Sequence, residues 1–188
     1  MGCCQQLSLE ELLGHTTFGF KACWWSDGLG YTYSAGYTGA VYDWQAGTNG
    51  TLTAFTNFVK TGGTLENEQY YAIALILKGL YYQRYTDTFG MVPYSEASDP
   101  DIITPKLDDQ KTIYKGIIAD LDEAIATIGS ETATGVGPEL LTTNDLFFNG
   151  DMQSWKKLAN SLKLKLALRA HGAVGEDFSV AAATAAIA

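Results

Sequence analysis

One run of apolar residues constrains the fold of this chain more than any other feature of its sequence. Between residues 113 and 128 the apolar positions recur at intervals of four, four, three and four, which are the intervals of one face of an α-helix. The stripe consists of Ile113, Ile117, Leu121, Ala124 and Ile128. Such a helix is stable only when its apolar face packs against other elements. The stripe therefore predicts a helical domain.

Other segments carry helical periods or the residues that begin and end helices. Asn67 or Thr64 is expected to cap one helix, Asp108 the stripe helix, and Asp151 or Ser154 a later one. Helices are expected over residues 7–13, 51–59, 65–85, 108–128, 151–169 and 179–188. The apolar face of the 65–85 helix is expected to hold Tyr70, Ile73, Leu77, Leu80 and Tyr81. Lys156, Lys157, Lys163 and Lys165 are expected on the solvated side of the 151–169 helix. Antiparallel helix pairs with wide apolar faces predict an all-α array.

Size and charge limit the possible partners. A chain of 188 residues fits one domain, so we expect a single domain over residues 1–188. The net charge of −9 disfavours nucleic acid and anionic lipid surfaces, and a neutral ligand fits better. The longest apolar stretch, residues 72–77, is too short to span a bilayer. Direct membrane binding is therefore not expected.

The residues that usually carry chemistry are few and lack motifs. The three cysteines form no Cys-x-x-Cys pair, and His15 and His171 are the only histidines, so we expect no metal site and no cofactor. Glycosidases use two carboxylates, but helix capping explains Asp145 and Asp151 better. We therefore expect no catalytic residues and no enzymatic activity.

Residues 14–50 form a segment rich in Gly, Thr and aromatic residues, without a sustained helical period. We expect it to be irregular. Aromatic faces stack on the apolar faces of sugar rings, although packing in a core would need the same residues. The candidate ligand-binding residues are Trp24, Trp25, Tyr37, Tyr42 and Trp44. Tyrosines of the 65–85 helix are instead expected to serve packing: Tyr70, Tyr71, Tyr81, Tyr82 and Tyr85.

Three stretches, in order, resemble one known family. The first runs from Thr86 to Ala97 and contains Asp87, a Phe-Gly pair, Val-Pro-Tyr and Glu-Ala. The second begins with Gln-Lys-Thr-Ile-Tyr at residue 110 and continues to Asp-Leu-Asp-Glu-Ala-Ile at 120–125. The third is Asp-Leu-Phe-Phe-Asn-Gly-Asp at 145–151 with the lysine-rich helix that follows. Together they are similar to the SusD/RagB family of nutrient-binding lipoproteins of Bacteroidota, in its SusD-like branch. Met91 departs from the aspartate of the family pattern.

The resemblance implies a tetratricopeptide-like helical superhelix with an irregular ligand-binding portion. It implies a cell-surface protein of the outer membrane that binds a glycan or peptide and delivers it to a TonB-dependent, SusC-like transporter. Membrane attachment would be through a lipid anchor that this chain does not contain. Family members are longer, so the chain is expected to be the N-terminal part of the pattern, truncated at its C-terminus.

Two hypotheses about function stay open on the sequence alone. One is nutrient binding, and the other is a helical-repeat scaffold that binds only protein. Exposure of Trp24, Tyr42 and Trp44 in one concave patch would favour the first, and their burial against helices the second. Six residues of the family motifs are expected to serve the structure rather than contact a ligand. These are Asp87, Pro93, Tyr94, Glu96, Asn160 and Arg169, with Arg169 pairing with an acidic residue.

Overall fold

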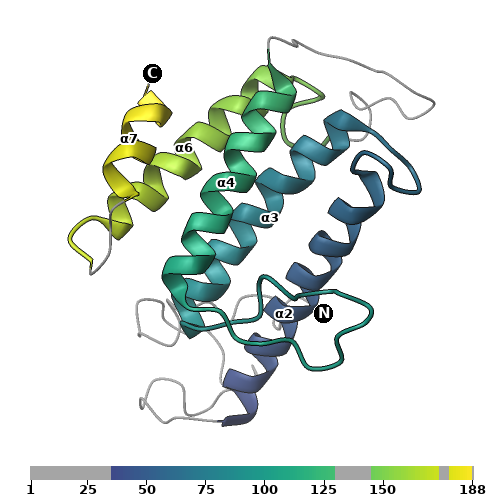
Figure 1. The fold of residues 1–188 in the computed structure, drawn as a ribbon, viewed down its shortest axis with the longest axis vertical. Helices are drawn as coiled ribbons and strands as arrows, with labels where there is room; N and C mark the ends of the chain where they lie inside the picture. The colour runs from purple at the N-terminus through teal and green to yellow at the C-terminus, as the bar shows by residue number, and fades with distance from the viewer. Residues whose placement is uncertain (1–34, 130–144, 174–177, 188) are drawn as a thin grey trace, which may run out of the picture. The chain divides into compact units, whose positions relative to one another are not determined.

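The structure, a computed structural model, describes residues 35–129, 145–173 and 178–187, and these ranges are largely helical (Figure 1). The helices are α2 (Ala35–Val59), α3 (Glu68–Phe89), α4 (Gln110–Ile128), α6 (Met152–Ala170) and α7 (Ser179–Ile187). Within the described ranges the one pairing of extended backbone is an isolated antiparallel bridge between Val92 and Asp108. The prediction of an all-α protein is therefore confirmed.

The chain separates into two compact units, Met1–Gln45 and Ala46–Ala188, and the boundary falls within α2. The first unit is described only from residue 35, and helices α3, α4, α6 and α7 all belong to the second unit. A single domain over residues 1–188 stays a prediction.

The α2 helix corrects the expectation that residues 35–50 are irregular. Its buried positions include the polar residues Gln45, Asn49 and Thr56, so the apolar period that predicts a helix is missing. Thr56 also satisfies its hydroxyl within the helix, by donating to the carbonyl oxygen of Leu52 at 2.8 Å. Residues 14–34 of the predicted irregular segment lie outside the described residues, as does the helix expected at 7–13.

Helices α3, α4 and α6 pack side by side in antiparallel order (Figure 1). Contacts between α3 and α4 pair residue 71 with 123, 78 with 120 and 87 with 114, so the two helices run in opposite directions. Between α4 and α6, Lys163 pairs with Asp122 and the Lys156 ammonium donates to the Gly129 carbonyl. The α7 helix packs on α6. The predicted antiparallel pairs are thus present.

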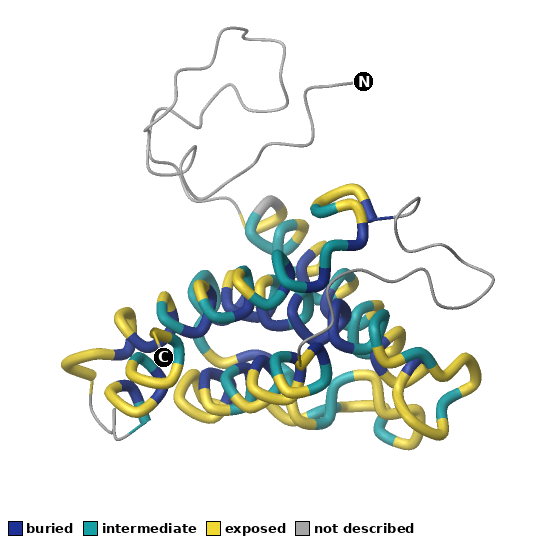
Figure 2. The backbone as a smooth tube through the Cα atoms, turned by 90° about the horizontal axis from the view of Figure 1, so that it is seen from above, coloured by how far each residue is buried: buried dark blue, intermediate teal, exposed yellow. Residues whose placement is uncertain are grey.

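The core of the second unit lies between these helices (Figure 2). All five residues of the α4 stripe are buried, with exposed fractions of 0 or 1%, as predicted. The predicted face of α3 is wrong in part, because Leu80 is exposed while Ala72, Leu75 and Ile76 are buried. Since α3 has neighbours on several sides, its apolar residues surround it and their period does not single out one face.

The helix ends follow local capping chemistry. Asn67 caps α3, accepting from the amides of Gln69 at 3.1 Å and Tyr70 at 3.0 Å, as predicted. Asp109, not Asp108, caps α4 and accepts from the Thr112 amide at 2.8 Å. Gly90 ends α3 with a φ of 76°, in the left-handed region that glycine tolerates best. No helix among the described residues is long and apolar enough to cross a bilayer.

Candidate functional site

The predicted ligand-binding residues fall at or before the middle of α2. Trp44 lies on this helix with 58% of its surface exposed, and Tyr42 is half-buried. Two residues apart on a helix, their side chains point about 200° apart and do not share a face. Tyr37 also lies in α2, but its side chain is not described, and Trp24 and Trp25 lie outside the described residues. A role for these five residues in binding stays a prediction, with Trp44 its best-placed member.

The loop between α3 and α4 has a base fixed by Asp108. The Asp108 amide donates to the Val92 carbonyl at 3.0 Å, which joins the two ends of the loop. Its carboxylate accepts from the backbone amides of Ser95 at 2.7 Å and Tyr94 at 3.3 Å. Burial acts to raise the pKa of Asp108, but these hydrogen bonds outweigh it and hold the pKa below its ordinary value. The two ends of the loop, which follow α3 and precede α4, are therefore fixed relative to each other.

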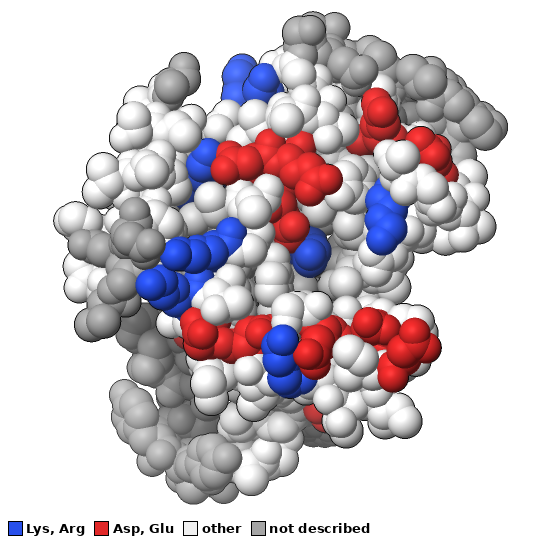
Figure 3. Space-filling model, in the orientation of Figure 1, with Lys and Arg blue, Asp and Glu red and all other residues white. Residues whose placement is uncertain are grey.

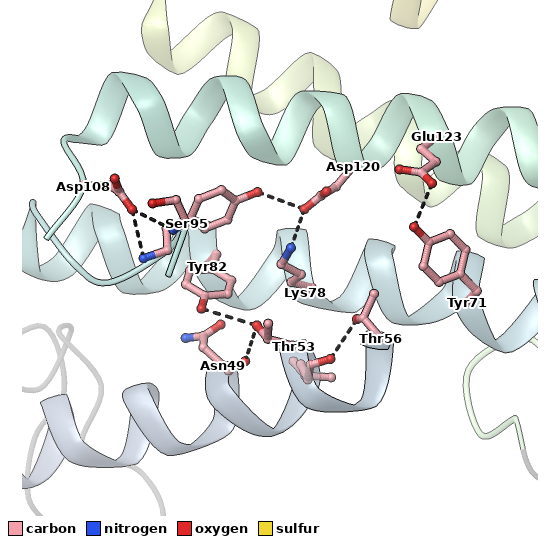
Figure 4. A network of polar contacts seen from close by, with 12 residues as sticks. Asn49, Thr53, Thr56, Tyr71, Lys78, Tyr82, Ser95, Asp108, Asp120 and Glu123 are labelled. Carbon is pink, nitrogen blue, oxygen red and sulfur yellow. Dashed lines mark hydrogen bonds and ion pairs between the residues drawn. The ribbon is translucent and has the colours of Figure 1, made fainter. Parts of the chain in front are cut away.

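Tyr94 anchors the same loop between α3 and α4. Its hydroxyl donates to Asp120 at 2.9 Å, and the Lys78 ammonium lies 2.9 Å from the same carboxylate oxygen. Its ring meets that of Tyr82 edge-on, with centroids 4.9 Å apart. Burial, together with the charge of Asp120, raises the pKa of Tyr94 far above its ordinary value, so the hydroxyl stays a donor. Figure 4 shows Lys78 of α3 pointing toward Asp120 of α4, while the Tyr82 hydroxyl points toward Thr53 of α2.

The rest of the loop is held by further hydrogen bonds and by one ion pair. Glu96 accepts from the Lys106 amide at 3.0 Å and forms an ion pair with its ammonium at 3.1 Å. The Ser98 hydroxyl donates to the Gly50 carbonyl of α2 at 2.9 Å. Met91, where the family pattern has an acid, is 58% exposed, and the turn is held instead by the Thr86 hydroxyl donating to Gly90. The α3–α4 loop is thus an anchored element of the second unit.

Asp87 connects the ends of three helices. It accepts from the Tyr114 hydroxyl at 2.6 Å and from the Gln110 amide nitrogen at 3.2 Å, and the Arg169 guanidinium lies 3.1 Å away. Burial, followed by the hydrogen bond to Asp87, raises the pKa of Tyr114 to about 12. The expectation that Asp87 and Arg169 are structural ties is confirmed.

Replacing Asp87 by alanine should therefore cost more stability than replacing Arg169. Asp87→Ala removes the acceptor of a buried hydroxyl, and we expect a loss of about 2 kcal/mol in the free energy of unfolding. Arg169 is half-exposed, so Arg169→Ala should cost about 0.5 kcal/mol. Urea unfolding of the two variants measures both values. Equal losses would show that the ion pair, not the Tyr114 bond, carries the contribution of Asp87.

Asp145 organises the turn that precedes α6. Its carboxylate accepts from the Trp155 indole at 2.7 Å, from the Gly150 amide at 2.9 Å and from the Phe147 amide at 2.8 Å. Asp151 caps α6 by accepting from the Gln153 amide at 3.0 Å. Both carboxylates are thus committed to capping, as predicted. Among the described residues no three His, Cys, Asp or Glu side chains are grouped to hold a metal ion.

Sequence reasoning missed the carboxylates of α4. Asp120 and Glu123 bind Lys78 and the Tyr71 hydroxyl of α3, and Asp122 pairs with Lys163 of α6. Lys163 is buried, which corrects the expectation that it lies on a solvated face. The motif Asp-Leu-Asp-Glu contains the signal, because successive acids at 120, 122 and 123 reach both sides of one helix.

Antiparallel helices joined by polar ties between α3, α4 and α6 make up the described part of the second unit. A family model described as "Starch-binding associating with outer membrane" matches residues 22–188, and the chain belongs to this SusD-like family. The resemblance seen in the motifs is therefore confirmed, together with the tetratricopeptide-like all-α fold. No curated protein matches the chain significantly.

Solved structures agree with this assignment. The chain is 30% identical to a structure titled chitin-binding protein, with a TM-score of 0.67 over 84% of this chain and 32% of that one. A chitin-binding SusD homologue from Flavobacterium johnsoniae is 32% identical, with a TM-score of 0.56 over 64% of this chain and 24% of its own. A SusD-like protein from Bacteroides thetaiotaomicron is 27% identical, with a TM-score of 0.56 over 63% of this chain and 24% of its own. The chain thus spans less than a third of these relatives.

Proposed function

We propose that this chain is the N-terminal part of a cell-surface protein that binds a neutral glycan and delivers it to a TonB-dependent transporter of the outer membrane. The observation that supports this most is the 30% identity, over 84% of the chain, to a protein whose title names chitin binding. A second relative with a chitin-binding title is 32% identical. Chitin-type oligosaccharides are therefore the first ligands to test.

The charge of the surface supports a neutral ligand. Acidic side chains gather over α4 and over the α3–α4 loop on the face seen in Figure 3. In that loop Glu96, Asp99 and Asp101 are accompanied by Lys106 as the only basic residue. Anionic polymers are repelled by such a surface, whereas an uncharged sugar is not. Sugar rings gain most from aromatic side chains, which favours the exposed indole of Trp44 as a contact.

Binding without chemistry is the proposed activity. Asp145 caps a turn and holds the Trp155 indole, Asp151 caps α6, and Asp87 joins three helices, so none of these is available as an acid or base. A glycosidase needs two such carboxylates facing one bond. Detectable hydrolysis of an oligosaccharide by the purified chain would contradict this part of the proposal.

Replacing Trp44 by alanine should weaken glycan binding about tenfold or more, because stacking of an aromatic ring on a ligand contributes on the order of 1 to 3 kcal/mol. Calorimetric titration with chito-oligosaccharide measures the affinity, because substitution of Trp44 removes one of the chain's own fluorescence reporters. Trp44→Phe keeps an aromatic face and should retain most of the affinity.

Phe147→Ala is the matched control for that experiment. Phe147 is also an exposed aromatic residue, at 65%, but it lies in the turn before α6 and has no role in the proposed contact. Equal weakening by Trp44→Ala and Phe147→Ala would remove Trp44 from the binding site. Unchanged affinity in Trp44→Ala would do the same.

Delivery to a transporter is tested by co-purification. Tagged chain, mixed with a detergent-solubilised SusC-like transporter from the same organism, should retain the transporter on the affinity resin. Retention with no response to any glycan would favour the scaffold hypothesis instead. Failure to retain it, with glycan binding intact, would leave the binding proposal standing and contradict the proposed delivery.

A further inference from the structure

The chain contains two Asn-Gly pairs, at residues 49–50 and 149–150. This dipeptide is the sequence most prone to spontaneous deamidation, because glycine leaves its amide nitrogen unhindered and its backbone free to bend. Asn49 is buried within α2, where the amide of Gly50 belongs to the helical hydrogen-bond ladder. Asn149 is different, since it is exposed and lies in the turn before α6.

The reaction places strict demands on the Gly150 amide. Its nitrogen must lose a proton to water or hydroxide and attack the side-chain carbonyl carbon of Asn149. A bond from that nitrogen to the carbon forms, the bond from the carbon to the side-chain nitrogen breaks, and ammonia leaves. Water then opens the resulting cyclic imide at either carbonyl, giving aspartate or isoaspartate. Anything that holds the proton on Gly150 therefore slows the first step.

Asp145 holds that proton directly. Its carboxylate accepts from the Gly150 amide at 2.9 Å, and Gly150 is buried. A negative charge at this distance stabilises the protonated amide and opposes formation of the amide anion. The carboxylate is itself fixed by the Trp155 indole at 2.7 Å, and the turn is closed by the Asp151 amide donating to Phe148 at 3.0 Å. Asn149 is held at a φ of 52°, within the same turn.

We propose that Asn149 is a latent deamidation site whose reaction requires opening of the turn held by Asp145. An isoaspartate at residue 149 lengthens the backbone by one carbon within this turn. The lengthened chain no longer places the Gly150 amide on Asp145, so the modified protein loses part of the capping of α6. Modification and loss of the turn therefore reinforce each other, and Asn149 acts as an ageing site of this chain.

The test is peptide mass spectrometry of the purified chain during incubation at mildly alkaline pH. In the folded protein, deamidation at Asn149 should be at least about tenfold slower than in the same chain in urea, because reaction must await local opening. Equal rates at Asn149 in the two conditions would overturn the proposal. This comparison needs no variant and so does not depend on the folding of one.

Two variants distinguish the effect of the hydrogen bond between the Gly150 amide and Asp145 from the general protection that any folded structure gives. Asp145→Asn removes the negative charge beside the Gly150 amide and should accelerate deamidation of Asn149 several-fold. Asp151→Asn removes a neighbouring charge that contacts Gln153 and Ser154 instead, and should leave the rate close to that of the wild-type chain. Circular dichroism establishes that each variant is folded. The role given to Asp145 would be overturned if both variants accelerated deamidation equally, or if neither variant accelerated it.

Discussion

Replacing Asp145 by alanine should destabilise this chain by about 3 kcal/mol or more, the largest effect expected of any single substitution considered. Asp145 has only 8% of its surface exposed, and its carboxylate is the shared acceptor of the Trp155 indole and the Gly150 amide. Truncation leaves both donors buried without an acceptor. Urea unfolding followed by circular dichroism measures the loss.

Asp151→Ala provides the comparison for that variant. Asp151 caps the same helix from a less buried position, so its loss should cost about 1 kcal/mol. If Asp145→Ala were no more destabilising than Asp151→Ala, Asp145 would be an ordinary cap and not the organiser of the turn.

The stability contributed by Asp145 should also depend on pH. Burial acts to raise the pKa of Asp145, but hydrogen bonds from the Trp155 indole and from backbone amides outweigh it, and its pKa lies below the ordinary value. The unfolded chain therefore binds the proton more tightly. The contribution is complete above the ordinary Asp pKa of about 3.9 and is lost as the pH falls through the lower pKa of the folded protein. Asp145→Ala should lack this part of the acid dependence.

Replacing Gly116 by alanine should destabilise the chain by about 2 kcal/mol, although the same change in most helices is stabilising. A Cβ atom at this position of α4 would lie 2.4 Å from a ring carbon of Tyr94 and 2.7 Å from its hydroxyl oxygen. The ring must shift, which strains its hydrogen bond to Asp120 and its edge-on contact with Tyr82. Thermal or urea unfolding measures the change.

Gly47→Ala is the matched control, because Gly47 also lies within a helix but a Cβ atom there meets no atom within 4 Å. We expect it to stabilise the chain by about 0.5 to 1 kcal/mol. The informative result is that the two substitutions should change the free energy of unfolding in opposite directions. A neutral or stabilising Gly116→Ala would mean that Tyr94 is free to move, and that the α3–α4 loop is not anchored by it.

The fold could be predicted best where the apolar residues of a helix all lie on one face. The α4 stripe is correct at every position because this helix buries a single face, and Asn67 and Asp151 are correct caps because capping is local chemistry. The face of α3 could not be predicted, since this helix is surrounded by neighbours. The helix over residues 35–50 could not be predicted either, because its buried side carries Gln45 and Asn49.

The ties of the second unit were only partly predictable. Arg169 is expected from the sequence to pair with an acidic residue, but the sequence does not say which one, and the structure shows that its partner is Asp87. The buried pair of Lys163 with Asp122 has no sequence signal of its own, because a lysine is ordinarily expected in solvent. The ligand-binding residues depend on contacts with a glycan, and periodicity carries no information about such contacts.

The central claim, that this chain binds a neutral glycan, is tested most directly by calorimetric titration of the purified chain with chito-oligosaccharides, and with malto-oligosaccharides as the second class. We predict saturable binding of at least one class, weakened by Trp44→Ala and preserved in Phe147→Ala. The absence of saturable heat with both classes, in a chain shown to be folded, would contradict the claim.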